Sequence, residues 1–208
     1  MLSPQDYFSL IKKLRSDCKY NVLTPESKNY ALCYSKLIHP ETCTICNDGY
    51  RHNEINGVFI DILPLWPLNH IEKELNKLKK YEKNGFVANE KGLFAFVKTQ
   101  GIVKSLVRIP YVIYCKALGK TLWSKKITDI LVQNMTLSKY YGLTPWDKKH
   151  CLDKSFFEAV EDVKFENLTL MIYKEYDKIL INSYGDYMKL PPESERRFPH
   201  NTELMYRR

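Results

Sequence analysis

The segment that most constrains the fold is the apolar run Gly57–Leu65, which carries one carboxylate, Asp61, at its centre. Its branched and aromatic residues predict a buried β-strand. Side chains alternate along a strand, so Asp61 shares a face with Phe59 and Leu63. A buried carboxylate is costly unless a cation or several hydrogen-bond donors meet it. We therefore expect Asp61 to have a partner, which could be a metal ion, an Arg or Lys side chain, a helix N-terminus, or hydrogen bonds at a strand end.

Other patterns predict a single unit of class α+β. A second strand is predicted over Tyr30–Ile38, next to the Asp61 strand in a central sheet, and residues 40–56 have the composition of a polar loop. Helices are predicted over residues 3–15, over residues 69–84 with Gly85 as the stop, and through the middle third of the chain. Two short strands at 163–166 and 168–173, a helix at 175–184 ended by Gly185, and an irregular tail from Glu193 complete the prediction.

The net charge of +8 favours anionic partners. Basic pairs are scattered along the chain instead of gathering in one helix or arm, so we do not expect a nucleic-acid partner. The N-terminus has no signal-peptide pattern and the six cysteines follow no disulfide framework, which indicates a reducing cytoplasm. Residues 93–118 are apolar and punctuated by basic residues, with Pro110 dividing them; they fit either core-facing helices or a surface that lies on an anionic membrane at its inner face.

Two kinds of site can be weighed from residue spacing. Cys43 and Cys46 form a C-x2-C pair that could bind zinc together with Cys33 and His52, but a second closely spaced pair is missing. The histidines follow no pattern of a nucleophile with its base, and the glycines are dispersed, so neither a catalytic triad nor a phosphate loop is predicted.

A more specific stretch runs from Tyr184 to Pro192 (Tyr-Gly-Asp-Tyr-Met-Lys-Leu-Pro-Pro) and is followed by Arg196, Arg197 and His200. A helix stop, a tight turn and a stiff Pro-Pro pair would hold Asp186 and the basic residues in a defined place.

Taken in order along the chain, these stretches resemble the LicD family of phosphotransferases. Gly57–Leu65 resembles the family's G-x-F-I-D-I-F-P-L strand, and Tyr184–Pro192 with Arg196 and His200 resembles its YGDYM-x-L-P-P ending. Further matches are Lys36 followed by Thr42, Phe165-Glu166 and Tyr176-Asp177.

The resemblance implies a truncated nucleotidyltransferase-like core with a mixed sheet in residues 1–68, and a helical and C-terminal region in residues 69–208 packed on it. It implies transfer of a phospho-substituent, phosphocholine above all, from a CDP-activated donor to a glycan or lipid-linked glycan acceptor. The alternative is a catalytically inactive remnant that binds glycan, nucleotide or a partner protein.

The resemblance also implies roles for individual residues. Asp61, Lys36 and Asp186 would be catalytic, and Asp61 would hold Mg²⁺ or Mn²⁺. The predicted substrate-binding residues are Thr42, Tyr184, Tyr187, Arg196, Arg197 and His200. Family members have paired aspartates in a P-W-D-D-D-x-D stretch that would lie before residue 1, and Trp146-Asp147 lacks that acidic run. We therefore expect this chain to bind the metal weakly or not at all.

Overall fold

The computed structural model describes residues 1–17, 19–27, 30, 32–46, 57–89, 102–196 and 202–207, of which 43–46, 102–106 and 202–207 are described by their backbone alone. The longer helices and the strands of these residues are α1 (Pro4–Ser16), β1 (Asn21–Leu23), β2 (Ser35–Ile38), β3 (Thr42–Cys46), β4 (Phe59–Ile62), β5 (Trp66–Leu68), α2 (Ile71–Asn89), α4 (Ile102–Gln133), β6 (Tyr140–Gly142), β7 (Cys151–Asp153), β8 (Val160–Phe165), β9 (Leu168–Tyr173), α5 (Tyr176–Tyr184) and β10 (Thr202–Arg207). Short 3₁₀ turns are η1 (Lys148–His150), η2 (Lys154–Phe157) and η3 (Glu193–Glu195).

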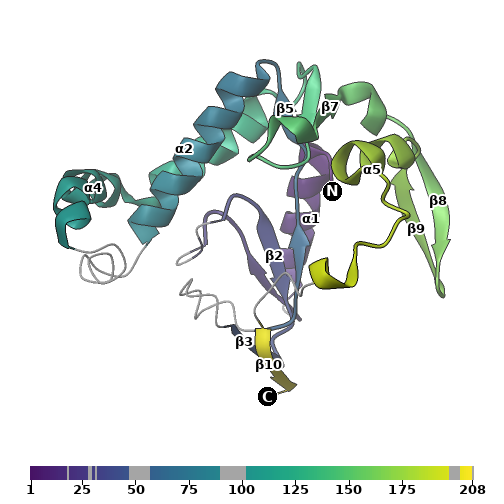
Figure 1. The fold of residues 1–208 in the computed structure, drawn as a ribbon, viewed down its shortest axis with the longest axis horizontal. Helices are drawn as coiled ribbons and strands as arrows, with labels where there is room; N and C mark the ends of the chain where they lie inside the picture. Colours follow the sequence, from purple (N-terminus) through teal and green to yellow (C-terminus); the bar gives the residue numbers. More distant parts are fainter. Residues whose placement is uncertain are drawn as a thin grey trace.

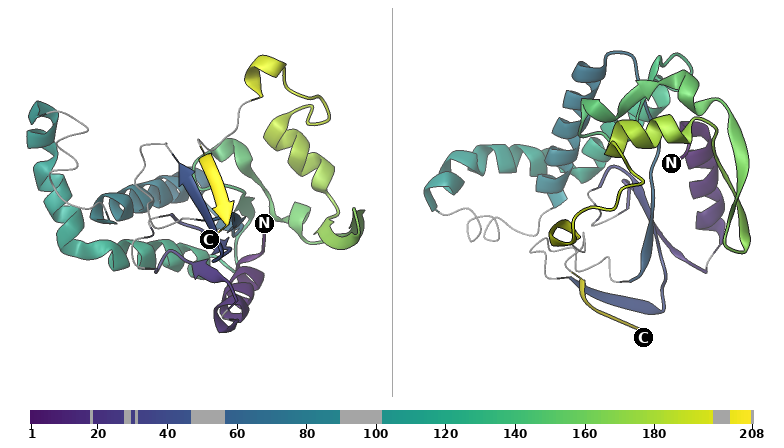
Figure 2. Two further views of the ribbon diagram at one scale, coloured as in Figure 1. Left: turned by 90° about the horizontal axis from the view of Figure 1, so that it is seen from below. Right: turned by 45° about the vertical axis from the view of Figure 1, so that its right-hand side comes forward.

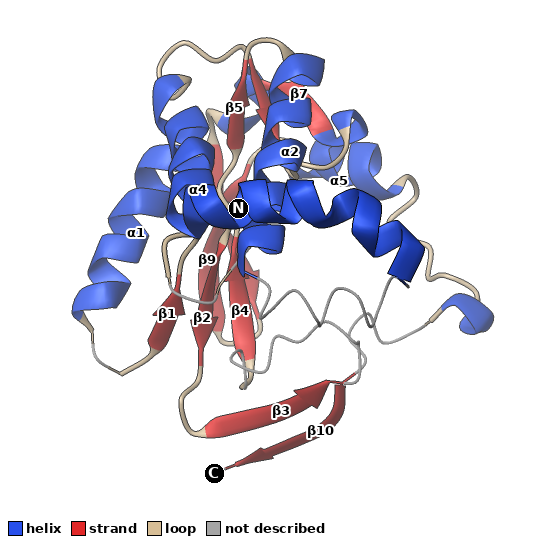
Figure 3. Ribbon diagram, turned by 90° about the vertical axis from the view of Figure 1, so that its left-hand side faces the viewer, coloured by secondary structure: helices blue, strands red, loops and turns tan. Residues whose placement is uncertain are grey.

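The structure confirms a mixture of helices and small sheets (Figure 1). The strands pair in the orders β1-β2-β4, β5-β6-β7, β3-β10 and β8-β9. Every ladder between the described strands is antiparallel, so the predicted mixed sheet is not seen in this part of the chain. The predicted neighbours, the Asp61 strand and the strand before it, do pair as β4 and β2 (Figure 3).

Helix α1 forms where its local signals predict. The Ser3 hydroxyl oxygen accepts a hydrogen bond from the backbone N–H of Asp6 at 3.2 Å, which caps the first turn. Tyr7 and Ile11, one turn apart, are buried in a cluster with Ile62 of β4. The helix therefore covers the inner face of the sheet that carries Asp61.

Helices α2 and α4 pack against each other and against β5 to make the largest core. This core joins Trp66 and Leu68 of β5 to Leu75 and Leu78 of α2 and to Ile127, Ile130 and Leu131 of α4. The predicted helix stop at Gly85 is wrong, because α2 continues to Asn89. A Cβ at Gly85 would lie 3.4 Å from the Cβ of Trp123, so the glycine allows α4 to approach closely.

The prediction that Pro110 divides the middle helix is also wrong. Pro110 lies inside α4, and the chain changes direction at Gly119, where φ is +74° and ψ is 153°. This left-handed φ suits glycine, since a Cβ there would clash with the backbone. The helices of the described residues include none that is long and apolar enough to cross a membrane.

The loop predicted over residues 40–56 and the irregular tail from Glu193 need a correction. Residues 42–46 form β3, and they pair with residues 202–207 of β10, with Cys43 opposite Tyr206 (Figure 3). Each segment is short and mixes polar with apolar residues, and its strand exists because of a partner distant in sequence, which local propensity does not encode.

The predicted hairpin and the helix after it are both present, although β8 spans Val160–Phe165 and so begins three residues before the predicted strand. β8 and β9 make a hairpin through Glu166 and Asn167, and Glu166 has φ of +52°. Gly185 ends α5 with φ of +71°, and its N–H donates to the carbonyl of Ile181. Residues Phe157, Tyr173 and Ile179 pack on Leu65 and anchor the hairpin and α5 to the body.

Candidate functional site

An ion pair links strands β2 and β4. Lys36 of β2 and Asp61 of β4 are directly opposite each other in the ladder, and Lys36 Nζ lies 3.0 Å from Asp61 Oδ1. Directly opposite residues project their side chains from the same face of a sheet, so the strand register brings the two charges together. The expected cation partner of Asp61 is therefore the ammonium group of Lys36.

The two partners differ in burial. The Lys36 side chain is 7% exposed and the Asp61 side chain is 32% exposed. The prediction of a buried strand is wrong for this part of β4, because β4 lies at the edge of its sheet and Ile60 is 65% exposed. The carboxylate can thus be reached from solvent, while the ammonium is enclosed beneath it.

Aromatic rings enclose the ammonium. Lys36 Nζ lies 3.4 Å from the ring centroid of Phe59 and 5.8 Å from that of Tyr34. Phe59 is two residues before Asp61 in β4, so its ring and the carboxylate share one face of the sheet, while Tyr34 lies immediately before β2, two residues from Lys36. A cation over an aromatic face is attracted by the ring's negative potential, which adds to the effect of Asp61. Residue spacing could have identified both rings, since they stand at i−2 from Lys36 and from Asp61.

A tyrosine hydroxyl and a thiol border this cluster. The hydroxyl of Tyr30 is buried and has no hydrogen-bond partner among the described residues. Burial raises the pKa of Tyr30, with further contributions from Tyr34 and from the negative charge of Asp61. Burial also raises the pKa of the Cys33 thiol, and the neighbouring Glu82 carboxylate raises it further. Both groups therefore stay protonated and neutral at physiological pH.

Glu82 belongs to a second set of contacts beside the ion pair, and sequence analysis did not single it out. The indole N–H of Trp146 donates to Glu82 Oε2 at 2.5 Å, whereas Glu82 Oε1 is buried with no partner among the described residues. The Trp146 ring also packs edge-on against Tyr34, with centroids 6.4 Å apart. No local pattern marks Glu82, which lies within the lysine-rich sequence of α2.

The residues of this site do not by themselves fit a resident metal ion. The described part of the chain has no group of three or more His, Cys, Asp or Glu side chains able to hold one. Asp61 offers a single carboxylate, and one of its oxygens already faces an ammonium. Mg²⁺ requires six oxygen ligands, so a carboxylate, water and donor phosphates would have to share it.

The zinc hypothesis gains no support from the described residues. Cys33 is a buried free thiol in the core next to Trp66. Cys43 and Cys46 lie in β3, where only the backbone is described, and His52 lies outside the described residues.

The YGDYM-type ending lies on a different element. Tyr184 and Asp186 are exposed at the end of α5, and the hydroxyl of Tyr187 donates to Asp177 Oδ1 at 2.7 Å. Arg196 donates from Nε to the Pro191 carbonyl. Within the described ranges no hydrogen bond or ion pair joins this ending to Lys36 or Asp61. Arg197 and His200 lie outside the described residues.

Thr42 lies close to the start of β4. Its hydroxyl donates to the His39 carbonyl at 2.9 Å and accepts from the Val58 N–H at 2.8 Å. Thr42 therefore ties β3 to the strand of Asp61, and its role in substrate binding stays a prediction.

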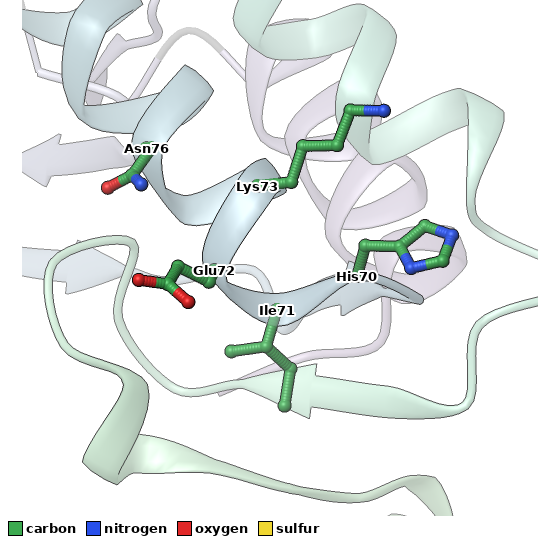
Figure 4. Close-up of a pocket in the computed structure, with 5 residues that line it drawn as sticks. All are labelled: His70, Ile71, Glu72, Lys73 and Asn76. Carbon is green, nitrogen blue, oxygen red and sulfur yellow. The ribbon is translucent and has the colours of Figure 1, made fainter.

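A surface pocket of about 540 Å³ lies at the first turn of α2, lined by His70, Ile71, Glu72, Lys73 and Asn76 (Figure 4). The N–H groups of Asn69 and His70 at this helix start both donate to Glu74 Oε2. The helix end is thus already capped by its own side chain, and none of the predicted site residues lines the pocket.

Comparison with known proteins supports the resemblance over part of the chain. A stretch of the chain is similar to a lipopolysaccharide cholinephosphotransferase. That relative is LicD of Haemophilus influenzae, with 36% identity over 72 residues, which amount to 35% of this chain and 25% of the relative. The matched stretch thus spans a quarter of the relative's length. No family model matches the sequence, and no solved structure matches it.

Proposed function

We propose that the chain is a member of the LicD family and serves in a phosphotransferase of the LicD kind. The observation that supports this most is the 36% identity to a cholinephosphotransferase over 72 residues. The proposed reaction moves phosphocholine from a CDP-activated donor to a hydroxyl of a cell-surface glycan precursor, on a nucleotidyltransferase-like fold.

The proposed chemistry is the attack of an acceptor hydroxyl oxygen on the phosphorus of phosphocholine. The bond from that phosphorus to the bridging oxygen breaks, and CMP leaves. Asp61, which solvent reaches, is the proposed acceptor of the hydroxyl proton. Lys36 is too enclosed to reach a donor directly, and its proposed role is to hold the Asp61 carboxylate in one orientation beneath the substrate.

The residues of the C-terminal ending complete the proposal. Tyr184 and Asp186 are exposed, which suits contact with a ligand. Arg196 would supply positive charge toward the donor diphosphate. The proposal includes Mg²⁺ or Mn²⁺ bound weakly by the Asp61 carboxylate, since the metal ion would compete with the Lys36 ammonium for that carboxylate.

The second candidate is a binding protein without turnover. It is favoured by the Lys36–Asp61 contact of 3.0 Å, because an ammonium occupies the position beside the carboxylate where the resemblance implies a metal. Such a protein would bind a nucleotide or glycan at the surface around Asp61.

The two candidates separate in one assay. The full chain is incubated with CDP-choline, Mg²⁺ and a lipopolysaccharide that lacks phosphocholine, and both CMP release and choline incorporation are measured. We expect metal-dependent turnover that Asp61→Asn abolishes, whereas Asp162→Asn, on the exposed hairpin, retains it. Circular dichroism verifies that both variants are folded.

Calorimetric titration with CDP-choline gives the complementary result. Binding of CDP-choline by a folded chain that releases no CMP would support the binding protein and contradict the enzyme. Absence of both CDP-choline binding and turnover would refute the enzyme and the nucleotide-binding protein; a further titration with the lipopolysaccharide that also shows no binding would refute the glycan-binding protein.

A further inference from the structure

Trp146 is an exposed aromatic residue whose ring is held in place. It is 43% exposed, whereas Trp66 and Trp123 are 1% and 2% exposed. Its indole N–H donates to Glu82 Oε2 of α2 at 2.5 Å, and its ring meets that of Tyr34 edge-on, with an interplanar angle of 78°. Contacts from two different elements thus fix a large ring that solvent can reach. Tryptophan is highly buried on average, so an indole fixed in this position needs an explanation.

The Glu82 carboxylate carries a charge that no cation matches. No Lys, Arg or His side chain of the described residues forms an ion pair with it. Its Oε1 is buried and without a hydrogen-bond partner in the same part of the chain, and its Oε2 already accepts from Trp146. The Cys33 thiol lies near this carboxylate but brings no positive charge. A carboxylate withdrawn from water is stabilised by a cation, so Glu82 favours a positively charged ligand beside it.

Tyr34 connects Glu82 and Trp146 to the Lys36–Asp61 pair. Lys36 Nζ lies 5.8 Å from the centroid of the Tyr34 ring and 3.0 Å from Asp61 Oδ1. Burial raises the pKa of Tyr34, and the negative charges of Asp61 and, more weakly, Glu82 raise it further. The Tyr34 phenol therefore lies within electrostatic reach of both carboxylates. Because the Lys36 ammonium already neutralises Asp61, the charge of Glu82 is the unmatched one beside the proposed proton acceptor.

The chemistry of these side chains favours one kind of cation. A primary ammonium group binds by donating N–H hydrogen bonds to oxygen, but Glu82 Oε1 is enclosed and Oε2 is occupied by the indole. A metal ion would require the same two oxygens. A quaternary ammonium group has no N–H, and it is recognised by aromatic rings and by negative charge nearby. The exposed ring of Trp146 and the charge of Glu82 supply both.

We propose that Trp146, Tyr34 and Glu82 bind the trimethylammonium group of a choline-bearing donor. The cation lies against the exposed indole ring, and the phosphorus of the donor points toward Asp61. Glu82 acts through its charge and by holding the indole in one orientation. The identity of the donor rests on the proposed function, whereas the contacts that support this inference involve none of the residues assigned there to catalysis.

The first test uses free choline and ethanolamine, which differ only in the methyl groups on nitrogen. Saturation-transfer NMR with the full chain gives the affinity of each at constant ionic strength. We expect choline to bind roughly tenfold more tightly than ethanolamine. Trp146→Leu should weaken choline binding roughly tenfold, because it removes the indole, and Glu82→Gln should weaken it roughly fivefold, because it removes the charge.

The matched controls are Phe165→Leu and Glu161→Gln on the β8–β9 hairpin. This hairpin lies away from α2 in both views of Figure 2. Phe165 is 59% exposed and Glu161 is also exposed, so the controls remove an aromatic ring and a carboxylate from another surface. Both controls should bind choline like the natural chain, and circular dichroism checks the fold of all the variants.

A second measurement separates this inference from the proposed function. CMP release from CDP-choline is compared with CMP release from CDP-ethanolamine, with the same lipopolysaccharide acceptor. A preference for CDP-choline that Trp146→Leu and Glu82→Gln both reduce would support the inference and the phosphotransferase. Choline binding that depends on Trp146, without any CMP release, would support the inference and contradict the phosphotransferase.

The inference alone would be overturned by CMP release with a choline preference that both variants retain. It would also be overturned by equal affinities for choline and ethanolamine, or by choline binding that Trp146→Leu leaves unchanged. Absence of both choline binding and CMP release would refute the inference and the phosphotransferase together.

Discussion

The Lys36–Asp61 pair predicts an asymmetric response to removing either charge. Asp61→Asn leaves an enclosed ammonium without its counter-charge, whereas Lys36→Met leaves a carboxylate that is 32% exposed. Water can hydrate that carboxylate but not the ammonium. The loss of stability should therefore be larger for Asp61→Asn.

The magnitude follows from the distance. Two unit charges 3.0 Å apart attract with about 5.5 kcal/mol at an effective dielectric constant of ~20, before the cost of desolvation is subtracted. The Asn oxygen can still accept a hydrogen bond from Lys36, and the Phe59 ring still faces the ammonium. We expect the free energy of unfolding to fall by about 2 kcal/mol for Asp61→Asn and by about 1 kcal/mol for Lys36→Met. The smaller loss arises because the methionine side chain fills the space of the lysine stem.

The assay is urea unfolding followed by circular dichroism, with both single variants and the double variant. The double variant should lose about as much stability as Lys36→Met alone, which gives a coupling free energy of about 2 kcal/mol. The control is Lys178→Met, which removes an exposed ion pair with Glu175 and should cost about 0.5 kcal/mol or less. A coupling below about 0.5 kcal/mol, or a larger loss for Lys36→Met than for Asp61→Asn, would refute the reasoning.

Three further outcomes can be measured by the same unfolding experiments. Gly85→Ala should raise stability by about 0.5–1 kcal/mol through helix propensity, whereas Gly85→Leu should lower it by about 1–3 kcal/mol through overpacking against α4. A Cβ at Gly57 would lie 2.7 Å from Ile38 Cγ2, so Gly57→Ala should destabilise the entry to β4, and no loss would contradict the geometry. Burial raises the pKa of Tyr7 from 10.0 to about 12. The unfolded chain therefore loses this proton at a lower pH than the folded chain. Between pH 10 and 12 the free energy of unfolding should fall as pH rises, by at most about 1.4 kcal/mol per pH unit from Tyr7. Tyr7→Phe should reduce that dependence, and Tyr184→Phe, at an exposed residue, should not.

Elements with complete local signals were predictable from the sequence. Ser3 and Pro4 define the start of α1, and Gly185 defines the end of α5, because a cap or a left-handed residue acts on its immediate neighbours. Gly85 carries the same local signal but lies within α2. At Gly85 the close approach of Trp123 decides whether the helix continues or ends, and this packing is a tertiary effect.

The site was predictable only in outline. The need of Asp61 for a cation follows from its apolar neighbours, but Lys36 was identified as its partner only by the strand register. The aromatic rings of Tyr34 and Phe59 follow from that register together with side-chain alternation. Glu82 could not be found from the sequence, since it reaches the site from a helix distant along the chain.

The pairing of β3 with β10 has a consequence for the order of folding. Cys43 meets Tyr206 across this ladder, so β3 stays an open edge during synthesis until residues 202–207 have been made. Closing so long a loop is entropically costly and slow compared with forming a hairpin such as β8–β9. Thr42, which ties β3 to the start of β4, therefore belongs to a part of the molecule that we expect to be completed last and to open first under stress.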